Sequence, residues 1–552
     1  MFSIDPQYIL QQLHLDPELI LQQLRYDAHA PLIFSSGLFL FLFLGFSFIY
    51  WTLSSRRTAT LRILFVTAFS YYFYYKSSGF YFALLAIVTV SDYLIARAIH
   101  AVMKNEELRM KNTDYIEDET KQHSSFFIRH SSFVRRMLLS VSLLLDLGLL
   151  AYFKYTNFFG SLWASVTGGH FTALDIFLPV GISFFTFQSM SYTIDVYRGE
   201  LRPLKSLLDY AFYVSFFPQL VAGPIVRARD FIPQIRQPLT VTNEMFGRAV
   251  FLIMAGLFKK AVISDYISVN FVERVFDQPN LYSGLENLLA VYGYTLQIYC
   301  DFSGYSDMAI GLALLLGFRF PKNFDAPYKS RSITEFWRRW HISLSSWLRD
   351  YLYISMGGNR HGKFRQRLNL MITMLLGGLW HGASLNFIIW GGYHGLLLCL
   401  DKWRMKNEEC RMKNTGITDT ETKKRSSFFT PHSSFFILHS SFQTLITFHL
   451  VCFGWIFFRN QSFDSAFAML HQIAYNFQPQ VFLQWAESYW AVGLMMLIGY
   501  TLHFLPARSS DAAQRLLTRM PLPLQAACIV IVAYIVVQIK SSDVQPFIYF
   551  QF

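Results

Sequence analysis

Long apolar stretches separated by short polar and basic segments dominate the chain. Residues 32–52 carry no charged side chain over about the length that a helix needs to cross a bilayer. Comparable runs follow near residues 64–75, 79–91, 137–153, 174–194, 208–226, 247–258, 285–300, 308–318, 368–384, 385–400, 443–458, 487–506 and 524–539. At roughly 20 residues per crossing, this pattern predicts an all-α polytopic membrane protein with about 11–13 transmembrane and re-entrant helices.

The low proportion of charged residues supports the same fold class. Charged side chains make up 15% of the 552 residues and hydrophobic ones 53%, whereas soluble domains carry about 25% charge. The net charge of +12 is explained by Lys and Arg in cytoplasmic loops, so no nucleic-acid partner is expected. Arg56, Arg57 and Arg62 place the 53–62 loop inside the cell. This predicts an extracytoplasmic N-terminus.

These patterns divide the chain into six segments. The first segment lacks the basic start and apolar core of a cleavable signal peptide, and its two copies of ILQQL predict an amphipathic lead-in at the membrane surface. The segments are the lead-in at 1–31, transmembrane helices at 32–102, a polar stretch at 103–136, a core at 137–403, a second polar stretch at 404–442 and C-terminal transmembrane helices at 443–552.

The two polar stretches are near copies of one another. Residues 103–133 are matched by residues 405–435 without a gap, whereas the flanking sequences differ. The peptide FFILH at 435–439 is also what the reverse complement of one coding sequence for MKNEE would encode. We therefore expect both stretches to be inserted low-complexity cytoplasmic loops that derive from an inverted-repeat DNA element. A functional docking loop is the alternative.

Residues 332–354 form the first segment with candidate chemistry. Ser332 and Glu335 have the spacing of a capping box and predict a helix start. The apolar positions that follow recur at helical spacing, which predicts one amphipathic interfacial helix. On that helix His341 falls at the border of the apolar face beside Arg338. From this position it could point into a cavity or be an ordinary interfacial histidine.

Residues 368–400 form the second such segment, and they contain no Asp, Glu, Lys or Arg. A single helix of this length would measure about 50 Å, too long for a ~30 Å hydrocarbon core. We therefore expect two short spans, with a break supplied by Gly377, Gly378 and Gly382. His381 would then lie at a turn inside the protein, where an ionisable residue suits a general base. A structural histidine bonded to a carbonyl is the alternative, and His394 is expected to be a packed helix residue.

Residues 297–328 place two carboxylates, Asp301 and Asp307, in apolar surroundings. Buried carboxylates need partners, and hydrogen bonding that holds the core is favoured over metal binding because no His or Cys cluster accompanies them. The five cysteines also lack metal-ligand spacing. We expect no metal and no permanently bound cofactor.

Taken together, the motifs resemble the bacterial branch of the membrane-bound O-acyltransferase (MBOAT) family, which includes alginate O-acetylases and teichoic-acid D-alanyl transfer proteins. The matching stretches include LPVGISFFTFQSMSYTIDVYRGE, FPQLVAGPIVR, QIYCDFSGYSDMAIG, NFDAPYKSRSITEFWRRWHISLSSWLRDYLYI, GGNR, GLWHGASLNFIIWGGYHG and FGWIFFR, in family order from about residue 31 to residue 460. The resemblance implies a ring of helices around a thin core, with a tunnel through the membrane, in the inner membrane of a bacterial cell.

The resemblance also implies roles for single residues. His381, in the WHG motif, corresponds to the principal catalytic histidine of the family, and His341 to its second important histidine. Supporting site candidates are Trp380, Asp301, Tyr305, Asn359, Arg360 and Arg338, with Asn359 and Arg360 expected to shape the donor entrance. The implied donor is a cytoplasmic thioester, either acetyl-CoA or a carrier-protein thioester. The implied acceptor is a hydroxyl of an extracytoplasmic glycan.

The expected activity is therefore transfer of an acyl group, acetyl above all, to an exported or cell-surface polysaccharide. A soluble periplasmic acyltransferase is an expected partner, in addition to membrane lipid. D-alanyl or peptidoglycan acyl transfer is an alternative within the family. A transporter or a scaffold of a polysaccharide export complex, neither of them catalytic, is an alternative from another class.

Overall fold

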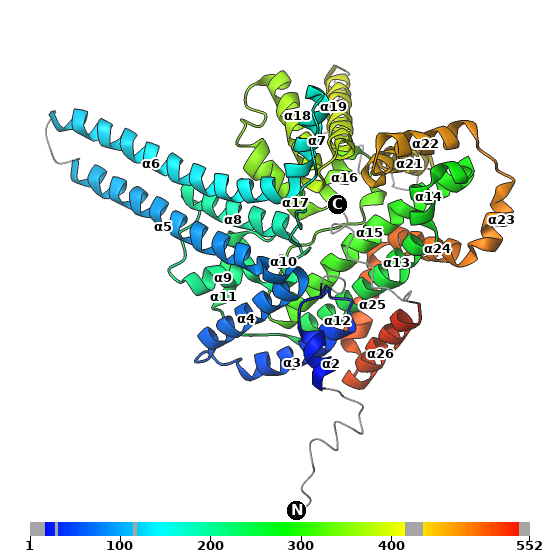
Figure 1. Cartoon of the computed structure of the whole chain (residues 1–552), viewed down its shortest axis with the longest axis horizontal. Helices are drawn as coiled ribbons and strands as arrows, with labels where there is room; N and C mark the ends of the chain where they lie inside the picture. Colours follow the sequence, from blue (N-terminus) through cyan, green and yellow to red (C-terminus); the bar gives the residue numbers. More distant parts are fainter. Residues whose placement is uncertain (1–16, 28–30, 114–118, 415–433, 540–552) are drawn as a thin grey trace, which may run out of the picture. The chain divides into compact units, whose positions relative to one another are not determined.

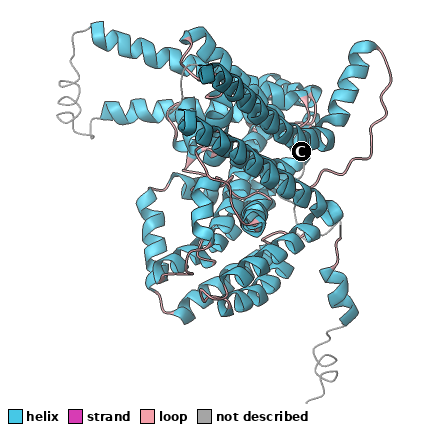
Figure 2. Ribbon diagram, turned by 90° about the vertical axis from the view of Figure 1, so that its left-hand side faces the viewer, coloured by secondary structure: helices cyan, strands magenta, loops and turns pink. Residues whose placement is uncertain are grey.

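The computed structural model describes residues 17–27, 31–113, 119–414 and 434–539. Every regular element in this part of the chain is a helix, and Figure 2 shows no strand among the described residues. The prediction of an all-α fold is therefore confirmed. Of the expected lead-in, residues 1–16 lie outside the described part, and Pro17–Leu24 form α2.

The described residues separate into two units, each with its own packing. The first unit contains residues up to Thr156 and residues 174–240, so part of the predicted 137–403 core groups with the N-terminal helices. Its elements are α2, α3 (Gly37–Thr52), α4 (Ala59–Ser78), η1 (Gly79–Tyr81), α5 (Phe82–Thr113), α6 (Glu119–Leu150), η2 (Ala151–Tyr155), α8 (Ile182–Tyr197), α9 (Leu207–Ser215), α10 (Phe217–Leu220) and α11 (Ala228–Ile235).

The second unit contains residues 157–173 and residues from Val241 onward. Its elements are α7 (Thr156–Thr167), α12 (Asn243–Leu257), η3 (Phe258–Ser264), α13 (Asp265–Ile267), η4 (Ser268–Val272), α14 (Glu273–Asp277), η5 (Pro279–Leu281), α15 (Gly284–Leu315), η6 (Pro327–Lys329), α16 (Ile333–Arg339), α17 (Ile342–Trp347), η7 (Leu348–Tyr353), α18 (Gly362–His381), α19 (Leu385–Asn414), α21 (Ser434–Arg459), α22 (Phe463–Tyr475), α23 (Val481–Ser488), α24 (Trp490–Phe504), α25 (Ala507–Arg519) and α26 (Leu522–Ile539).

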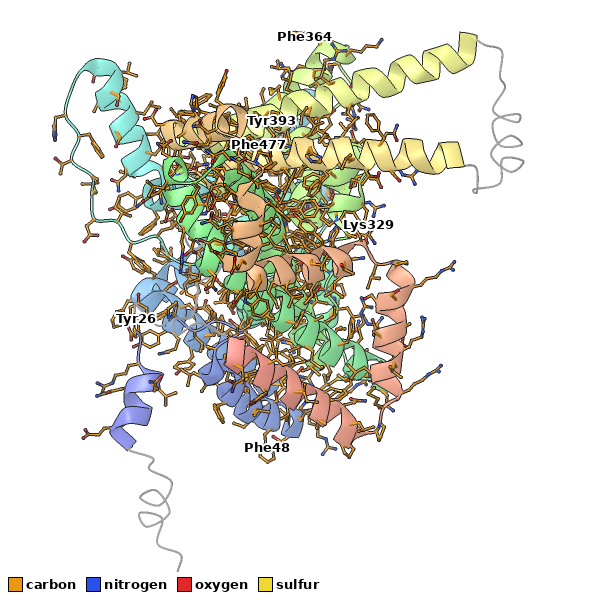
Figure 3. The ribbon with its side chains drawn as sticks, turned by 90° about the vertical axis from the view of Figure 1, so that its right-hand side faces the viewer. Tyr26, Phe48, Lys329, Phe364, Tyr393 and Phe477 are labelled. Atoms are coloured by element: carbon orange, nitrogen blue, oxygen red, sulfur yellow. The ribbon has the colours of Figure 1, made fainter. Side chains whose placement is uncertain are left out.

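Three stretches of described helix have the length and apolar composition needed to cross a membrane: Ala59–Leu108, His130–Thr167 and Ser441–Arg459. A fourth is obtained if α23 and α24, which meet at an angle of 89°, count as one broken span. The larger expected number includes shorter and re-entrant segments and remains a prediction. Phe48 in the first unit and Phe364 in the second are 76% and 81% exposed, and Figure 3 shows these labelled side chains at the margin of the ribbon. Exposed phenylalanines of this kind suit contact with lipid.

The described parts of the two repeated stretches are helical, where the sequence predicted loops. Helix α5 continues to Thr113, and α6 begins at Glu119 and runs back beside it, as Figure 1 shows. Ser131 of α6 donates a hydrogen bond to Glu106 of α5 at 2.8 Å, and Arg135 lies 3.4 Å from the same carboxylate. These contacts support helix in the copied segment because they pair polar side chains across two antiparallel helices.

Candidate active site

The hairpin of α18 and α19 carries His381. Helix α18 ends at His381, Gly382 is extended, and α19 begins at Leu385. This confirms the predicted break near Gly382. Gly377 and Gly378, which were also expected to break the helix, lie inside α18 instead. A Cβ atom at Gly378 would lie 2.2 Å from the Phe387 carbonyl oxygen, so this glycine allows the two helix backbones to touch.

His341 also lies at a break between helices. The predicted single helix over 332–354 is wrong: α16 ends at Arg339, α17 begins at Ile342, and residues 348–353 form a π-helical turn. Ser332 does cap α16, because its side chain accepts a hydrogen bond from the Glu335 N–H at 3.2 Å. His341 adopts a left-handed conformation with φ of 43°, a backbone state that sequence periodicity does not reveal.

The two histidines lie on a shared aromatic cluster. The ring of Trp380 has its centroid 5.0 Å from that of His381 and 6.2 Å from that of His341. His381 also packs against Trp390 at 5.2 Å and Phe458 at 5.3 Å. Both histidines are buried, with exposed fractions of 3% for His381 and 0% for His341. Residues far apart in the sequence thus bring two imidazoles to one buried, aromatic-lined site.

Asn323 and Phe302 hold the ring of His341. The Asn323 Oδ1 atom lies 3.2 Å from His341 Nδ1, and the ring of Phe302 meets the imidazole edge to face at 4.5 Å between centroids. The sequence did not single out either residue. Asn323 lies in a loop eighteen positions before its partner, and Phe302 lies on α15, so only the folded chain brings them to the histidine.

The supporting candidates have different surroundings. Trp380 is part of the cluster. Asp301 on α15 forms an ion pair with Lys260, which also lies 2.8 Å from Asp265, so this carboxylate has the partner that its burial demands. Tyr305 is buried further along the same helix. Arg338, Asn359 and Arg360 are exposed, and the structure leaves these three outside the buried cluster.

His394 matches the expectation of a packed helix histidine. Its ring lies among the aromatic side chains of Phe336, Trp337, Trp390 and Tyr393 and is fully buried. Neither ring nitrogen has a hydrogen-bond partner within the described part of the chain. His394 therefore contributes to packing beside the site.

A cavity of about 760 Å³ lies elsewhere in the second unit, along α15, α21 and α24. Tyr292, Phe448 and Tyr500 line it, as does Lys329, which is labelled in Figure 3. Neither catalytic histidine candidate lines this cavity. The expected tunnel through the membrane thus remains a prediction.

The chain is similar in sequence to known proteins over most of its length. The model of the membrane-bound O-acyltransferase family matches residues 71–418. A probable alginate O-acetylase of Pseudomonas aeruginosa is 39% identical over 79% of this chain and 74% of its own length. A peptidoglycan O-acetyltransferase of Helicobacter pylori is 33% identical over 80% of this chain and 79% of its own.

A more distant relative, a teichoic acid D-alanyltransferase of Bacillus subtilis, is 28% identical over 51% of this chain and 69% of its own length. All three relatives are named for the transfer of an acyl group, to alginate, to peptidoglycan or to teichoic acid. The extent of the family match and the identity to the first two relatives are sufficient to assign the family. The chain belongs to the MBOAT family of membrane-bound O-acyltransferases.

Proposed function

We propose that this acyltransferase moves an acetyl group from a cytoplasmic thioester to a hydroxyl of an exported polysaccharide. The observation that carries the proposal is the burial of His341 and His381 around Trp380. The names of the relatives that are about 40% identical, all alginate O-acetylases, favour acetyl and a glycan over D-alanine or peptidoglycan. The donor would be acetyl-CoA or a carrier-protein thioester.

In this proposal His381 accepts the proton of the acceptor hydroxyl as its oxygen attacks the thioester carbonyl. General-base assistance of this kind is worth about 10²–10⁴-fold in rate. The C-terminal end of α18, where His381 lies, carries partial negative charge and stabilises a positive charge that develops on the ring by ~0.3–1 kcal/mol. The surrounding aromatic rings exclude water and so limit hydrolysis of the thioester.

Two roles are open to His341 in this scheme. A ring N–H could donate a hydrogen bond to the donor carbonyl, or a ring nitrogen could relay the proton. Asn359 and Arg360, exposed at the turn before α18, would shape the donor entrance rather than touch the reacting atoms.

The proposal also covers the membrane location, the topology and the partner of the enzyme. We place it in the bacterial inner membrane with its N-terminus outside, the catalytic core within residues 137–403 and both repeated stretches on the cytoplasmic side. A soluble extracytoplasmic acyltransferase is its proposed partner in delivering the acetyl group to the polysaccharide.

The test compares His381→Ala with the wild type in an acetyl-transfer assay on membranes. We expect turnover to fall by about 10²–10⁴-fold. His394→Phe is the matched control, because His394 is also a buried histidine on the same hairpin and packs among aromatic rings. The transfer rate of this variant should stay close to wild type. Undiminished transfer by a folded, inserted His381→Ala protein would refute the assignment and favour a transporter or a scaffold.

A further inference from the structure

The orientation of the Asn323 side-chain amide follows from its neighbours. Oδ1 of Asn323 lies 3.2 Å from the backbone N of Ser343 and 2.9 Å from the Ser343 hydroxyl. A backbone N–H can only donate, so the amide atom that faces it must be the oxygen. The amide nitrogen then faces the Ser306 hydroxyl on α15, 3.1 Å away, and donates to it. If the amide were flipped, its NH2 group would face the backbone N–H of Ser343, and two donors would meet without an acceptor.

This orientation decides which nitrogen of His341 carries the proton. The same Oδ1 atom lies 3.2 Å from His341 Nδ1. Because an amide oxygen can only accept, Nδ1 must be the nitrogen that bears hydrogen. In the neutral ring, Nε2 then holds the lone pair. Nε2 is buried and has no hydrogen-bond partner among the described residues, so this acceptor is available to a reactant.

We propose that Asn323 is a positioning residue that holds His341 in the Nδ1–H tautomer, so that His341 acts as a proton acceptor through Nε2. This inference rests on the proposed function, and it chooses between the two roles left open there. A neutral Nε2 has no hydrogen to donate to the donor carbonyl. It can receive a proton.

The proton balance of acyl transfer accommodates this role. The hydroxyl oxygen forms the new ester bond to the acyl carbon, the carbon–sulfur bond breaks with its electron pair on sulfur, and the hydroxyl proton must reach the thiolate. His381 accepts the hydroxyl proton, as proposed above; Nε2 of His341 then receives this proton in the relay and returns it to sulfur. Nδ1–H stays bonded to Asn323 throughout, because Oδ1 accepts from the neutral and the protonated ring alike, and the ring does not need to turn.

A purely structural role for Asn323 is the competing explanation. Its backbone carbonyl accepts from the Ile342 N–H at 2.9 Å, and its side chain accepts from Ser343, so the residue also closes the turn into α17. Loss of activity alone would not separate the two roles. The decisive measurements are therefore the tautomer of His341 and the pH profile of transfer.

The first experiment is ¹⁵N NMR of the full-length, ¹⁵N-histidine-labelled protein in lipid, without any acyl donor. The signals that disappear in His341→Gln identify this ring. We expect hydrogen on Nδ1 and a bare Nε2. Hydrogen on Nε2 would overturn the inference, and because no turnover is involved, that result would leave the proposed acyltransferase function untouched.

The second experiment compares Asn323→Asp with Asn323→Leu. Aspartate keeps an acceptor oxygen and adds a negative charge that favours the imidazolium, so transfer should persist with the acid limb of its pH profile moved to higher pH. Leucine removes the acceptor, and we expect transfer to fall by about 100-fold and the His341 tautomer to change.

Asn369→Leu is the matched control, because Asn369 is another buried asparagine and donates to the carbonyls of Met356 and Gly358. Its variant should lose thermal stability and keep the wild-type pH profile. If Asn323→Leu behaves in the same way, Asn323 only closes the turn and the inference is wrong. If Asn323→Leu does not fold, Asn323→Asp decides: an unmoved acid limb refutes the inference.

Discussion

Gly378 offers the sharpest test of how the helix hairpin positions His381. A Cβ atom there would lie 2.2 Å from the Phe387 carbonyl oxygen and 3.1 Å from Gly391 Cα. Ordinary contacts between a carbon atom and a carbonyl oxygen are about 3.3–3.6 Å. Both neighbours are backbone atoms and cannot rotate away, so Gly378→Ala must move α18 and α19 apart by about 1 Å.

The expected effect on stability is smaller than the effect on rate. Overpacking costs about 1–3 kcal/mol, and alanine in place of glycine inside a helix returns about 1 kcal/mol, so the net loss is roughly 0–2 kcal/mol. His381 lies three residues further along α18, and a displacement of about 1 Å at a reacting group costs on the order of 100-fold in rate. We therefore expect acetyl transfer to fall by about that factor, with a small drop in melting temperature.

Gly377→Ala is the control next to it in the sequence. A Cβ atom at Gly377 would have Leu348 Cδ1 as its nearest neighbour, at 3.2 Å, and this methyl group can rotate away. That variant should transfer at the wild-type rate. Both variants would be purified in detergent and compared by acetyl transfer and by thermal unfolding. Equal rates and equal melting temperatures for the two variants would refute the argument that close backbone contact positions His381.

Two further predictions concern charged groups in the second unit. Lys260→Met removes the cation shared by Asp301 and Asp265. We expect the free energy of unfolding to fall by about 3–5 kcal/mol, seen as a large drop in melting temperature. An equally large drop on removal of the more exposed ion pair between Lys259 and Asp307 would contradict this reasoning. The second concerns Asp325, whose pKa is lowered by the hydrogen bond from Lys322 at 2.5 Å. Because its folded-state pKa is depressed, the pair stabilises the protein above the unfolded pKa of about 3.9, and this contribution disappears as the pH falls through the lower folded value. Both side chains are about half exposed or more, so Lys322→Gln should lose at most ~1 kcal/mol at pH 7 and less than that at pH 3. A stability difference that grows as the pH falls would reverse the predicted sign.

The hairpin that carries His381 could be predicted from the sequence because the information is local. An uncharged run too long for one crossing, with glycines near its middle, requires a break, and the break was found at Gly382. Gly377 and Gly378 were misassigned because a glycine that opens a turn and a glycine that allows two helices to touch look alike in one sequence. Only the packing of Phe387 against α18 separates the two cases.

The surroundings of His341 could not be predicted because they depend on contacts between separate segments. The apolar spacing over 332–354 is helical on both sides of the break, so periodicity continues across a residue that leaves the helix. The partner of Nδ1, Asn323, lies in a preceding loop, and the ring that packs on the imidazole, Phe302, comes from α15. The same limitation explains why Asp301 was identified without its partner Lys260.

The left-handed backbone of His341 affects how any variant at that position should be interpreted. A residue other than glycine in this region carries roughly 1–2 kcal/mol of strain, and the contacts of the imidazole with Phe302 and Asn323 help to offset it. Truncation to alanine removes those contacts and keeps the strain. The backbone can then leave the left-handed conformation, which changes the conformation of the whole turn. Asparagine tolerates the left-handed region and keeps a polar side chain at this position. It is therefore the substitution that separates loss of the imidazole from collapse of the turn between α16 and α17.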